Sequence, residues 1–385
     1  MDTIGRRGRR LAPVEHRFGL EADFALGIEE ELLLVNETDF GPANIASELV
    51  ATLDPEQGSI MNDLYEALIE TATPVVRSAP EGIEHLAAHR ERLRDAGAAF
   101  IGGGLHPNAA FGDVVRVPME RYEAIHREMR GLVSRTPTAA VHVHVGMPDP
   151  ETAIAVFNRL RAHLPLLQAL AAHSPFWHGA DSGLASARAV TFRAFPRSTI
   201  PPAFNDWAEY EELVDWCVEA AEVADYSYLW WDIRPSPKLG TIEVRAMDSQ
   251  SRLATVAGLA ALIHGLAVAC ADGNEERMPP TEALKESSFR AARDGVDASI
   301  WWRGGMRPIR EVGADALELA RPYARELDGE DALEEIDRVL REGGGADRMR
   351  AAHAAGGLDE VLAQAAAESY GYASTQTTSP MRSQS

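Results

Sequence analysis

Apolar and polar residues alternate with a period of two in several short segments before residue 250, which predicts half-buried β-strands. The segment AVHVHVGM, residues 140–147, places histidines between apolar residues. The segments YLWWDIRP, 228–235, and GTIEVRAMD, 240–248, alternate in the same way and flank the turn sequence PSPKLG, which predicts a β-hairpin. The polar side of these strands carries His, Glu, Asp and Arg, whereas an ordinary solvent-facing strand carries Ser, Thr or Lys.

Apolar residues at three- and four-residue intervals predict helices over 80–98, 150–173, 207–224 and 252–271, and the chain after about residue 280 looks helical throughout. The predicted strands are concentrated before residue 250 and are not interleaved evenly with helices. Parallel strands would also be apolar on both sides. We therefore predict an α+β fold in which helices cover one face of an antiparallel sheet.

The chain is long enough for one large catalytic domain, which we place at 23–373. Residues 1–22 are basic and lack an apolar h-region, which predicts a flexible, solvated leader and not a signal peptide. The tail at 374–385 has a disordered composition. No run of eighteen apolar residues appears, so we expect no membrane span. Cys217 and Cys270 are far apart, which argues against a disulfide framework and fits a cytoplasmic location.

The formal net charge is −22. A nucleic-acid binder would show a basic stripe, so this charge argues against that class of partner. Acidic surface charge mainly supports solubility and says little about chemistry.

The segment LGIEEELLLV, residues 26–35, places three consecutive glutamates in a predicted strand. A period of two sends Glu29 and Glu31 to one face and Glu30 to the other. The flanking residues are apolar on both faces, which favours a central strand over a solvent-facing edge strand. Two carboxylates on a central strand need cations to stay ionised together, and Mg²⁺ is the natural partner. We expect Glu30 to be structural or solvated, and Glu30→Gln to have a mild effect on Mg²⁺-dependent turnover.

Two further clusters are compatible with metal binding. In MNDLYEALIETATPV, Glu66 and Glu70 share a face in either a strand or a helix, and Asp63 needs a bulge or turn to join them in a strand. The alternative for this group is a solvated helix surface. His142 and His144 share one face of their strand and suit a metal through imidazole nitrogen, or else they are half-buried histidines with backbone partners.

The predicted hairpin offers the charged residues Asp232, Arg234, Glu243, Arg245 and Asp248. Glu243 and Arg245 share a face, either as a simple ion pair or as a metal ligand beside a guanidinium, the pairing that a polyphosphate site needs.

Glycine-rich and polar loops give weaker signals. FIGGGLHPN, 100–108, is a strand that runs into three glycines, either a plain turn or a close backbone approach to a ligand. SPFWHGADSGLASARA, 174–189, has the composition of a substrate or nucleotide loop. The P-loop, GxGxxG, GxSxG, HExxH and CxxC patterns are absent, which argues against nucleophilic hydrolases. Five or six carboxylates, a histidine pair and several arginines instead suit two or three Mg²⁺ ions holding ATP phosphates.

These segments together resemble the carboxylate–amine ligase family often called glutamate–cysteine ligase type 2. The resemblance runs in family order from about Leu26 to Gly295 and is carried by LGIEEELLLV, ALIETATPV, GGGLHP, HVHVG, LAAHSPFWHG, ASARAVTFRAFP, WWDIRPSPKLGTIEVRAMD and FRAARDG. One departure is His173 in LAAHSPFWHG, where many members carry a small residue.

The resemblance implies a glutamine-synthetase-like fold, in which a curved antiparallel sheet forms an ATP and metal funnel on its inner face and helices pack on its outer face. It implies ATP-dependent joining of a carboxylate to an amine through an acyl phosphate, with weak formation of γ-glutamylcysteine, ADP and phosphate. L-glutamate and an amine such as L-cysteine are then the substrates. The sequence leaves the amine, the number of metals and a homo-oligomeric state open.

By analogy with the family, residues are carried over position by position. The implied metal ligands are Glu29, Glu31, Glu70, His142 and Glu243, with Asp63 as a further candidate. Arg234 and Arg245 are implied as catalytic phosphate contacts. His144, Ser186 and Arg188 are implied to line the substrate or nucleotide pocket. Two rival hypotheses remain, which are a metal-dependent hydrolase using the same carboxylates and histidines and a catalytically silent ATP-binding homologue.

Overall fold

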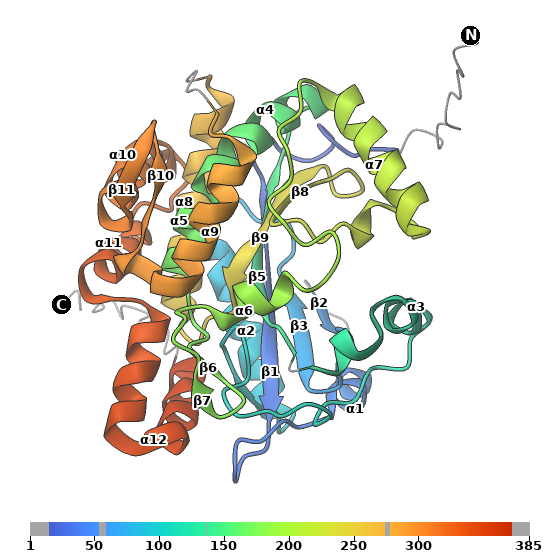
Figure 1. Ribbon diagram of the computed structural model, residues 1–385, viewed down its shortest axis with the longest axis vertical. Helices are drawn as coiled ribbons and strands as arrows, with labels where there is room; N and C mark the ends of the chain where they lie inside the picture. The colour runs from blue at the N-terminus through green and yellow to red at the C-terminus, as the bar shows by residue number, and fades with distance from the viewer. Residues whose placement is uncertain (1–14, 54–58, 136, 274–277, 372–385) are drawn as a thin grey trace, which may run out of the picture.

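One antiparallel sheet runs through the middle of the molecule (Figure 1). The computed structural model describes residues 15–53, 59–135, 137–273 and 278–371. The sheet has seven strands in the order β2-β3-β1-β5-β9-β8, with β4 also paired to β1. Their bounds are Leu26–Val35 (β1), Ser59–Asn62 (β2), Leu68–Ala72 (β3), Ala99–Ile101 (β4), Ala140–Gly146 (β5), Ile233–Ser236 (β8) and Thr241–Asp248 (β9). All its pairings are antiparallel, so the predicted fold class is confirmed.

Strand β1 lies at the centre of this sheet. It pairs with β3 along one side, and along the other it pairs first with β5 and then with β4. The central position predicted from its apolar flanks is confirmed, and the alternative of a solvent-facing edge strand is wrong. The predicted hairpin is also present, because β8 and β9 pair across the turn at 237–240.

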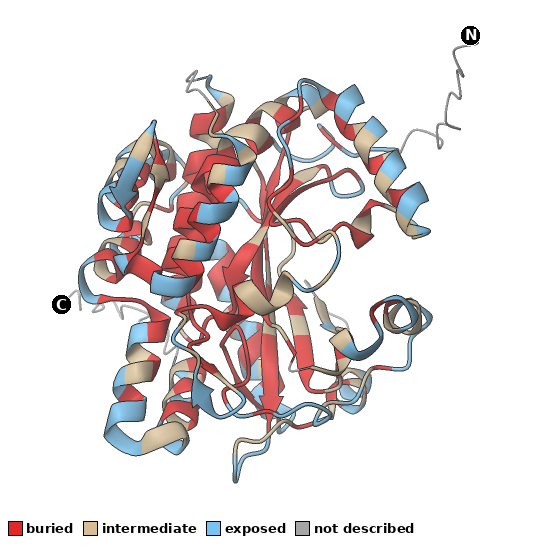
Figure 2. Ribbon diagram, in the orientation of Figure 1, coloured by how far each residue is buried: buried red, intermediate tan, exposed pale blue. Residues whose placement is uncertain are grey.

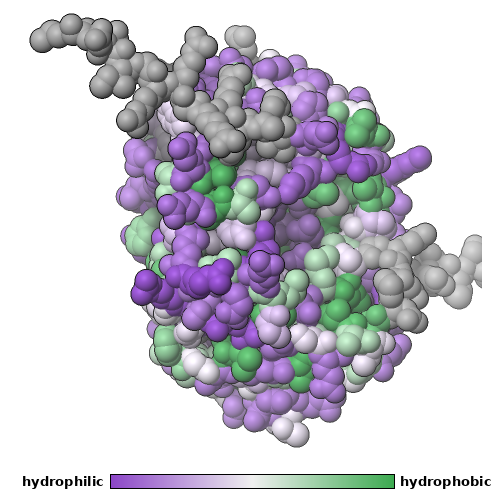
Figure 3. Space-filling view, turned by 90° about the vertical axis from the view of Figure 1, so that its right-hand side faces the viewer, coloured by the Kyte–Doolittle hydropathy of each residue, from purple (hydrophilic) through white to green (hydrophobic). Residues whose placement is uncertain are grey.

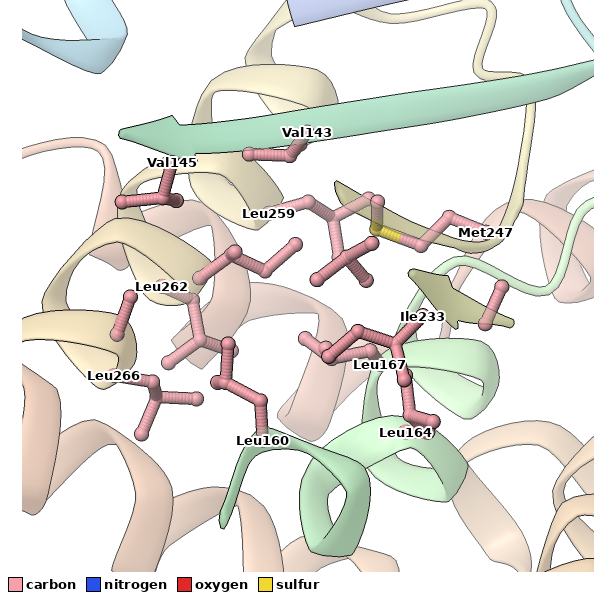
Figure 4. Packing of buried hydrophobic residues seen from close by; sticks show 14 of the residues in the cluster. Val143, Val145, Leu160, Leu164, Leu167, Ile233, Met247, Leu259, Leu262 and Leu266 are labelled. Carbon is pink, nitrogen blue, oxygen red and sulfur yellow. The ribbon is translucent and has the colours of Figure 1, made fainter. Parts of the chain in front are cut away.

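Helices cover the face of the sheet that carries the aliphatic side chains (Figures 1 and 4). Val143 and Val145 of β5 pack against α8 (Leu253–Ala271), and the same cluster includes residues of α4 (Pro150–Leu160) and α5 (Leu164–Leu170). Figure 2 shows these inner helices and the central strands as largely buried. The remaining helices are α1 (Ala46–Thr52), α2 (Ala79–Asp95), α3 (Glu120–Met129), α6 (Ala187–Phe192), α7 (Trp207–Ala221), α9 (Thr281–Asp294), α10 (Ile309–Glu326), α11 (Leu333–Glu342) and α12 (Gly345–Tyr370).

By length and composition α8 is apolar enough to cross a membrane, and it is the one such helix among the described residues. In the structure 83% of its apolar window is buried, and it packs against α2, α4, α10 and α11. We therefore assign α8 as the central core helix of this fold.

Some expectations about the elements need correction. The helix predicted over 150–173 is broken at 161–163 by a 3₁₀ turn, directly before Pro165. The region after residue 280 is not wholly helical, because β10 (Ser299–Trp302) and β11 (Gly305–Pro308) form a hairpin. Its sequence SIWWRGGMRP combines an aromatic run with a Gly-Gly pair, which is a hairpin signal.

The basic leader predicted over 1–22 is wrong for its last part. The amide of Arg17 donates to the carbonyl of Pro237 (2.9 Å), and Phe18 is buried against Trp207 with ring centroids 5.3 Å apart. An aromatic residue after the arginines was the signal for this contact. Residues 1–14 and the predicted tail at 374–385 lie outside the described residues.

The glycines after β4 serve a close approach to the chain itself. A Cβ on Gly102 would lie 2.2 Å from the backbone of Gln250, and one on Gly104 would lie 2.5 Å from the carboxylate carbon of Asp248. These distances are far inside van der Waals contact, so any side chain there would push β4 away from the segment that follows β9. Gly102 and Gly104 therefore allow two parts of the scaffold to meet closely.

Glu30 lies on the helix-covered face and is fully buried. Arg90 of α2 binds it with two hydrogen bonds, Nε to Oε1 (3.0 Å) and Nη2 to Oε2 (2.7 Å). The same guanidinium donates to the backbone carbonyls of Gln250, Ser251 and Ser369. Of the two roles predicted for Glu30 the structural one is therefore confirmed, and a solvated Glu30 is wrong.

Candidate active site

A ladder of charged side chains crosses five neighbouring strands on the open face of the sheet. Register places the Cα of Glu31 opposite Glu70 and that of Glu29 opposite His142. The ladder continues through His144, which lies opposite Glu243, and Glu243 in turn lies opposite Arg234. Since side chains in a strand alternate between faces, these pairings put all seven side chains on one face.

A break in the register adds a further arginine to this face. Between Val141 and Val143 the pairing of β5 with β9 shifts, so that Arg245 and Ala246 together lie opposite His142. Such a β-bulge re-aims the side chains on the bulged strand. Arg245 lines the same cavity as the ladder.

The cavity above the ladder has a volume of about 330 Å³. Five carboxylates, two histidines and four arginines line it, and all the metal ligands implied by the family resemblance are among them. Asp63 reaches the cavity from the turn between β2 and β3, as its spacing required. Figure 3 faces the side of the molecule that carries α3 and α7, where hydrophilic side chains predominate. The lining residues that carry charge are Glu29, Glu31, Asp63, Glu70, Arg121, His142, His144, Arg188, Arg234, Glu243 and Arg245.

Glu29 lies between the two histidines. Its Oε2 is 3.1 Å from Nδ1 of His142, and its Oε1 is 3.3 Å from Nε2 of His144. Burial raises the pKa of Glu29, but the charge of His144 and the contacts of both rings outweigh it and hold that pKa well below its usual range. Burial lowers the pKa of His142 to about 4, so its ring is neutral and able to bind a cation.

Glu243 is held by two arginines at once. Arg234 donates through Nε to Oε2 (3.0 Å), and Arg245 donates through Nη1 to Oε1. Burial disfavours the charged form, but these two guanidinium groups more than offset it and lower the pKa of Glu243. Arg234 also donates to the carbonyls of Ser227 and Leu229, so it is the more firmly anchored of the two arginines.

In the part of the chain that the structure describes, the other three carboxylates form no hydrogen bond with an arginine. Burial and the charge of Asp63 raise the pKa of Glu31 to about 8, although the amide of Ala140 donates to its Oε2 (2.7 Å). Burial raises the pKa of Asp63, and burial together with the charges of Glu29, Asp63 and Glu31 raises the pKa of Glu70 well above its usual value. Burial thus favours the neutral form of all three groups, so their joint ionisation requires positive charge from a ligand.

The donor set fits a divalent cation. One ligand atom each from Glu29, His142 and Glu243 lies within 4.8 Å of the others. Within the described residues, Nε2 of His144 is buried without a hydrogen-bond partner, although it faces Glu29. A cation beside Glu31, Glu70 and Asp63 would offset the burial that raises all three pKa values and the repulsion that adds to it for Glu31 and Glu70. Oxygen-rich sites of this kind suit Mg²⁺.

Arg188 of α6 reaches the cavity as predicted, with a guanidinium that is only partly engaged. The whole residue is buried, its nearest carboxylate oxygen on Asp248 is 3.7 Å away, and its Nε has no hydrogen-bond partner among the described residues. Burial lowers the pKa of Arg188. It is therefore well placed to accept an anion from the cavity.

Ser186 does not line the cavity, which corrects the prediction for this residue. Its hydroxyl donates to Asp248 Oδ1 (2.8 Å) and accepts from the amide of Ala189 as the N-cap of α6. The hydroxyl of Ser174 donates to the other oxygen of Asp248 (2.7 Å). His173 is also buried away from the cavity, with Nδ1 3.1 Å from the carbonyl of Ser249. These residues support the position of α6, which carries Arg188.

Glu66 does not join Glu70, which corrects the predicted shared face. Strand β3 begins only at Leu68, and the Glu66 carboxylate instead binds the amide (2.8 Å) and the hydroxyl (2.6 Å) of Ser47 in the first turn of α1. Asp232 binds Arg193 at the outer edge of the site and does not line the main cavity.

Sequence reasoning missed the wall opposite the sheet. This wall consists of uncharged and aromatic side chains from the α3 region, from the end of α6 and from the segment before β8. The local sequence pattern did not predict this wall, because its segments are distant from one another in sequence and each has the pattern of an ordinary amphipathic element. The residues that line it include Leu64, Tyr122, Ile125, Val133, Phe192, Phe195 and Trp230.

Comparison with known proteins agrees with this geometry. Residues 25–364 match the family described as Glutamate-cysteine ligase family 2. A putative glutamate–cysteine ligase 2-1 of Rubrobacter xylanophilus is 35% identical over 88% of this chain and 92% of its own length. A glutamate–cysteine ligase of Haloquadratum walsbyi is 33% identical over 88% of this chain and 94% of its own length.

Solved structures share the fold at low sequence identity. The glutamate–cysteine ligase of Francisella tularensis in complex with AMP has a TM-score of 0.63 and 13% identity, over 91% of this chain and 90% of that chain. A bifunctional glutathione synthetase of Pasteurella multocida has a TM-score of 0.64 and 15% identity, over 90% of this chain and 52% of that one. The chain thus shares the fold of these two proteins. With its family match and its full-length relatives, the chain belongs to glutamate–cysteine ligase family 2 and is a ligase.

Proposed function

We propose that this enzyme uses ATP and Mg²⁺ to join the side-chain carboxylate of L-glutamate to a primary amine, in the cytoplasm. The observation that carries the proposal is the cavity in which five carboxylates and two histidines on one sheet face meet four arginines. Family membership and the names of the relatives support the ligase reaction, with L-cysteine as an acceptor that is used weakly. The AMP complex of a structural neighbour supports an adenine nucleotide as the other substrate.

The residues that would hold Mg²⁺ divide into two groups. Glu29, His142 and Glu243 form one, and Glu31, Asp63 and Glu70 form the other. When bound, Mg²⁺ supplies positive charge that orients the phosphate chain and offsets developing negative charge. The shared cavity face would bring two or three such ions close to one polyphosphate.

The chemistry follows in two balanced steps. A side-chain carboxylate oxygen of glutamate attacks the γ-phosphorus of ATP, the bond to the β-phosphate oxygen breaks, and ADP leaves with the electron pair. The nitrogen of the amine then attacks the carbonyl carbon of the acyl phosphate. The carbon–oxygen bond to phosphate breaks, the nitrogen loses a proton, and the amide and inorganic phosphate are released.

The arginines of the cavity have two different roles, which are positioning Glu243 and contacting phosphate. Arg234 holds Glu243 in place through contacts to its carboxylate and to two backbone carbonyls. Arg245 and Arg188 both line the cavity, and among the described residues Nε of Arg188 has no hydrogen-bond partner. Both would contact the transferred phosphoryl group. Donors that are fixed before the reaction stabilise a charged transition state without reorganisation.

An ADP-release assay tests the proposal across pairs of carboxylates and amines, with glutamate plus cysteine first. The ligase forms ADP only when both substrates are present. A metal-dependent hydrolase would need no ATP, and a silent homologue would bind ATP–Mg²⁺ without releasing phosphate. Family membership does not favour either alternative.

Arg245→Ala tests the assignment of the phosphoryl contact. Loss of one preorganised donor costs about 2.7–4 kcal/mol in the transition state, so turnover should fall roughly a hundredfold or more. The variant should still fold, since Arg234 remains bound to Glu243. ADP release at saturating substrates measures the loss, and near-normal turnover would overturn the role given to Arg245.

A further inference from the structure

The uncharged wall of the cavity lines the same space as the charged ladder. We propose that this wall, formed by Leu64, Tyr122, Ile125, Val133 and Trp230, is the subsite for the acceptor amine, and that the preferred acceptor is a primary amine with an aliphatic or aromatic side chain larger than that of cysteine. This inference rests on the ligase function proposed above and names its second substrate class.

The position of Tyr122 ties the wall to the charged side of the cavity. Its hydroxyl donates to the carbonyl of Asn62 (3.0 Å), at the end of β2. In the pairing of β2 with β3, Asn62 lies opposite Ile69 and Met61 lies opposite Glu70, and Asp63 follows Asn62 in the chain. The ring of Tyr122 is therefore fixed next to two of the unpaired carboxylates.

The electrostatics agree with this placement. Burial and then the charges of Asp63, Glu70 and Glu31 raise the pKa of Tyr122. Tyr122 lines the same cavity as Asp63, Glu70 and Glu31. An acceptor whose ammonium group is drawn to these carboxylates would have its side chain against the wall.

The chemistry of the wall excludes a polar side chain. Ile125 and Val133 are buried members of an apolar cluster with Met129 and Tyr228, and Leu64 and Trp230 pack against that cluster. The hydroxyl of Tyr122 is already engaged. An acceptor with a hydroxyl or carboxylate at this end would leave that group without a partner, which is costly in an apolar site.

The nearest cation at the cavity mouth is also engaged. Arg121 of α3 donates to the hydroxyl of Ser227 (3.1 Å) and lies over the ring of Tyr228, 4.5 Å from its centroid. Arg197 binds Glu128 of α3 (2.7 Å) and lies 5.3 Å over the ring of Trp230. These two arginines connect α3 to the segment before β8, so they hold the two sides of the wall together.

The size of the wall sets the expected preference. The side chain of cysteine is a single methylene and a thiol, and it would cover little of a surface built from five side chains. A longer aliphatic or an aromatic group would cover more of it. Each additional methylene buried there should improve kcat/KM about fourfold.

A series of acceptors tests the proposal at saturating ATP, Mg²⁺ and glutamate. The amines are methylamine, propylamine, isoamylamine and phenethylamine, with ethanolamine as the polar match for propylamine and with cysteine for reference. We expect kcat/KM to rise along the apolar series, and propylamine to exceed ethanolamine about tenfold. Equal use of propylamine and ethanolamine, or a preference for cysteine over phenethylamine, would overturn the inference.

Two variants locate the effect. Ile125→Ser should lower kcat/KM for phenethylamine about tenfold while the KM for ATP stays within about twofold. Met129→Ser is the matched control, because Met129 belongs to the same buried cluster but does not line the cavity. It should leave the ratio between phenethylamine and ethanolamine unchanged. A raised KM for ATP in Ile125→Ser would instead make this wall the site of the nucleotide base.

A binding measurement separates this inference from the ligase proposal. Phenethylamine is titrated into the protein loaded with ADP and Mg²⁺, and tryptophan fluorescence is recorded for the native chain and for Trp230→Phe. Suppose that phenethylamine quenches the native chain saturably but does not quench Trp230→Phe, and that no amine causes ADP release from ATP. The apolar subsite would then stand, and the ligase reaction would be refuted. Turnover with amines but no such quenching would refute the subsite and keep the reaction.

Discussion

Strand β1 places the same side chain in two opposite surroundings. Glu30 is sealed beneath helices, where one guanidinium binds both of its oxygens. Glu29 and Glu31 lie on the other face, with 23% and 12% of their side chains exposed to the cavity. One residue type in consecutive positions therefore serves the scaffold on one side and the site on the other.

The difference lies in where the compensating charge comes from. Glu30 is neutralised inside the protein by Arg90, which is fixed in turn by three backbone carbonyls. Among the described residues Glu31 forms no such bidentate pair, and Nε2 of His142 lies 3.8 Å from its Oε1. Burial and the charge of Asp63 raise the pKa of Glu31 to about 8. A buried charge without a partner is unfavourable unless a bound ligand of opposite charge neutralises it. The carboxylates of the cavity face therefore favour cation binding.

The largest expected effect comes from the scaffold face. Glu30→Gln would leave the buried guanidinium of Arg90 without its counter-charge, and breaking such a pair costs about 3–5 kcal/mol. Urea denaturation measures this loss in the free energy of unfolding. Glu31→Gln is the matched control, because glutamine resembles the protonated carboxyl that burial favours there, and its stability should change by less than about 1 kcal/mol. Equal losses in both variants would remove the distinction between the two faces.

The next largest expected effect is on turnover, which should depend on the cavity-face glutamates and not on Glu30. Glu29→Gln and Glu31→Gln each remove a charge that would hold a cation at the phosphates, and ADP release should fall about 10²–10³-fold. Glu30→Gln, measured at a temperature where it is folded, should keep turnover within a few-fold of the native enzyme. If all three variants lost activity to the same extent while folded, the assignment of faces would be wrong.

The pH dependence of cation binding sharpens the comparison further. Because the pKa of Glu31 is raised to about 8, the proton must leave before a cation binds, and affinity should increase as pH rises. For one such group the Kd for Mg²⁺ should fall about tenfold per pH unit below pH 8 and level off above it. Isothermal titration calorimetry between pH 6.5 and 9 checks this slope. Because the pKa of Glu31 is higher in the folded than in the unfolded protein, the cation-free protein loses stability as pH rises towards 8. The increase in melting temperature caused by Mg²⁺ should therefore become larger as pH rises.

What the sequence predicted correctly depends on rigid local geometry. The strand period alone separates Glu29 and Glu31 from Glu30 and puts His142 beside His144, and the turn at 237–240 brings the two hairpin strands together. These relations need no knowledge of distant segments. The family resemblance supplied the chemistry, and the structure then assembled those side chains on one face.

What the sequence could not predict depends on contacts between distant segments. Arg90 lies 60 residues from Glu30, and no local pattern identifies it as the partner. The apolar wall joins α3 to Trp230 across about a hundred residues. The position of Ser186 was mistaken for a similar reason, since a serine in a polar loop reads equally well as a pocket residue and as the helix cap that it is.

Glu66 and Glu70 give the smallest and most local version of the comparison. They are four residues apart and carry the same side chain, yet Glu70 lies in the cavity and Glu66 binds the first turn of α1 through the amide and hydroxyl of Ser47. Glu66→Gln keeps one acceptor but loses the charge at a helix N-terminus, so we expect a loss of about 1 kcal/mol in unfolding free energy and unchanged ADP release. Glu70→Gln should do the opposite, with stability kept and ADP release reduced. Thermal unfolding and turnover are measured for both variants. If Glu66→Gln and Glu70→Gln behaved alike in both measurements, both carboxylates would be surface groups, as the alternative of a solvated helix surface predicts for this segment.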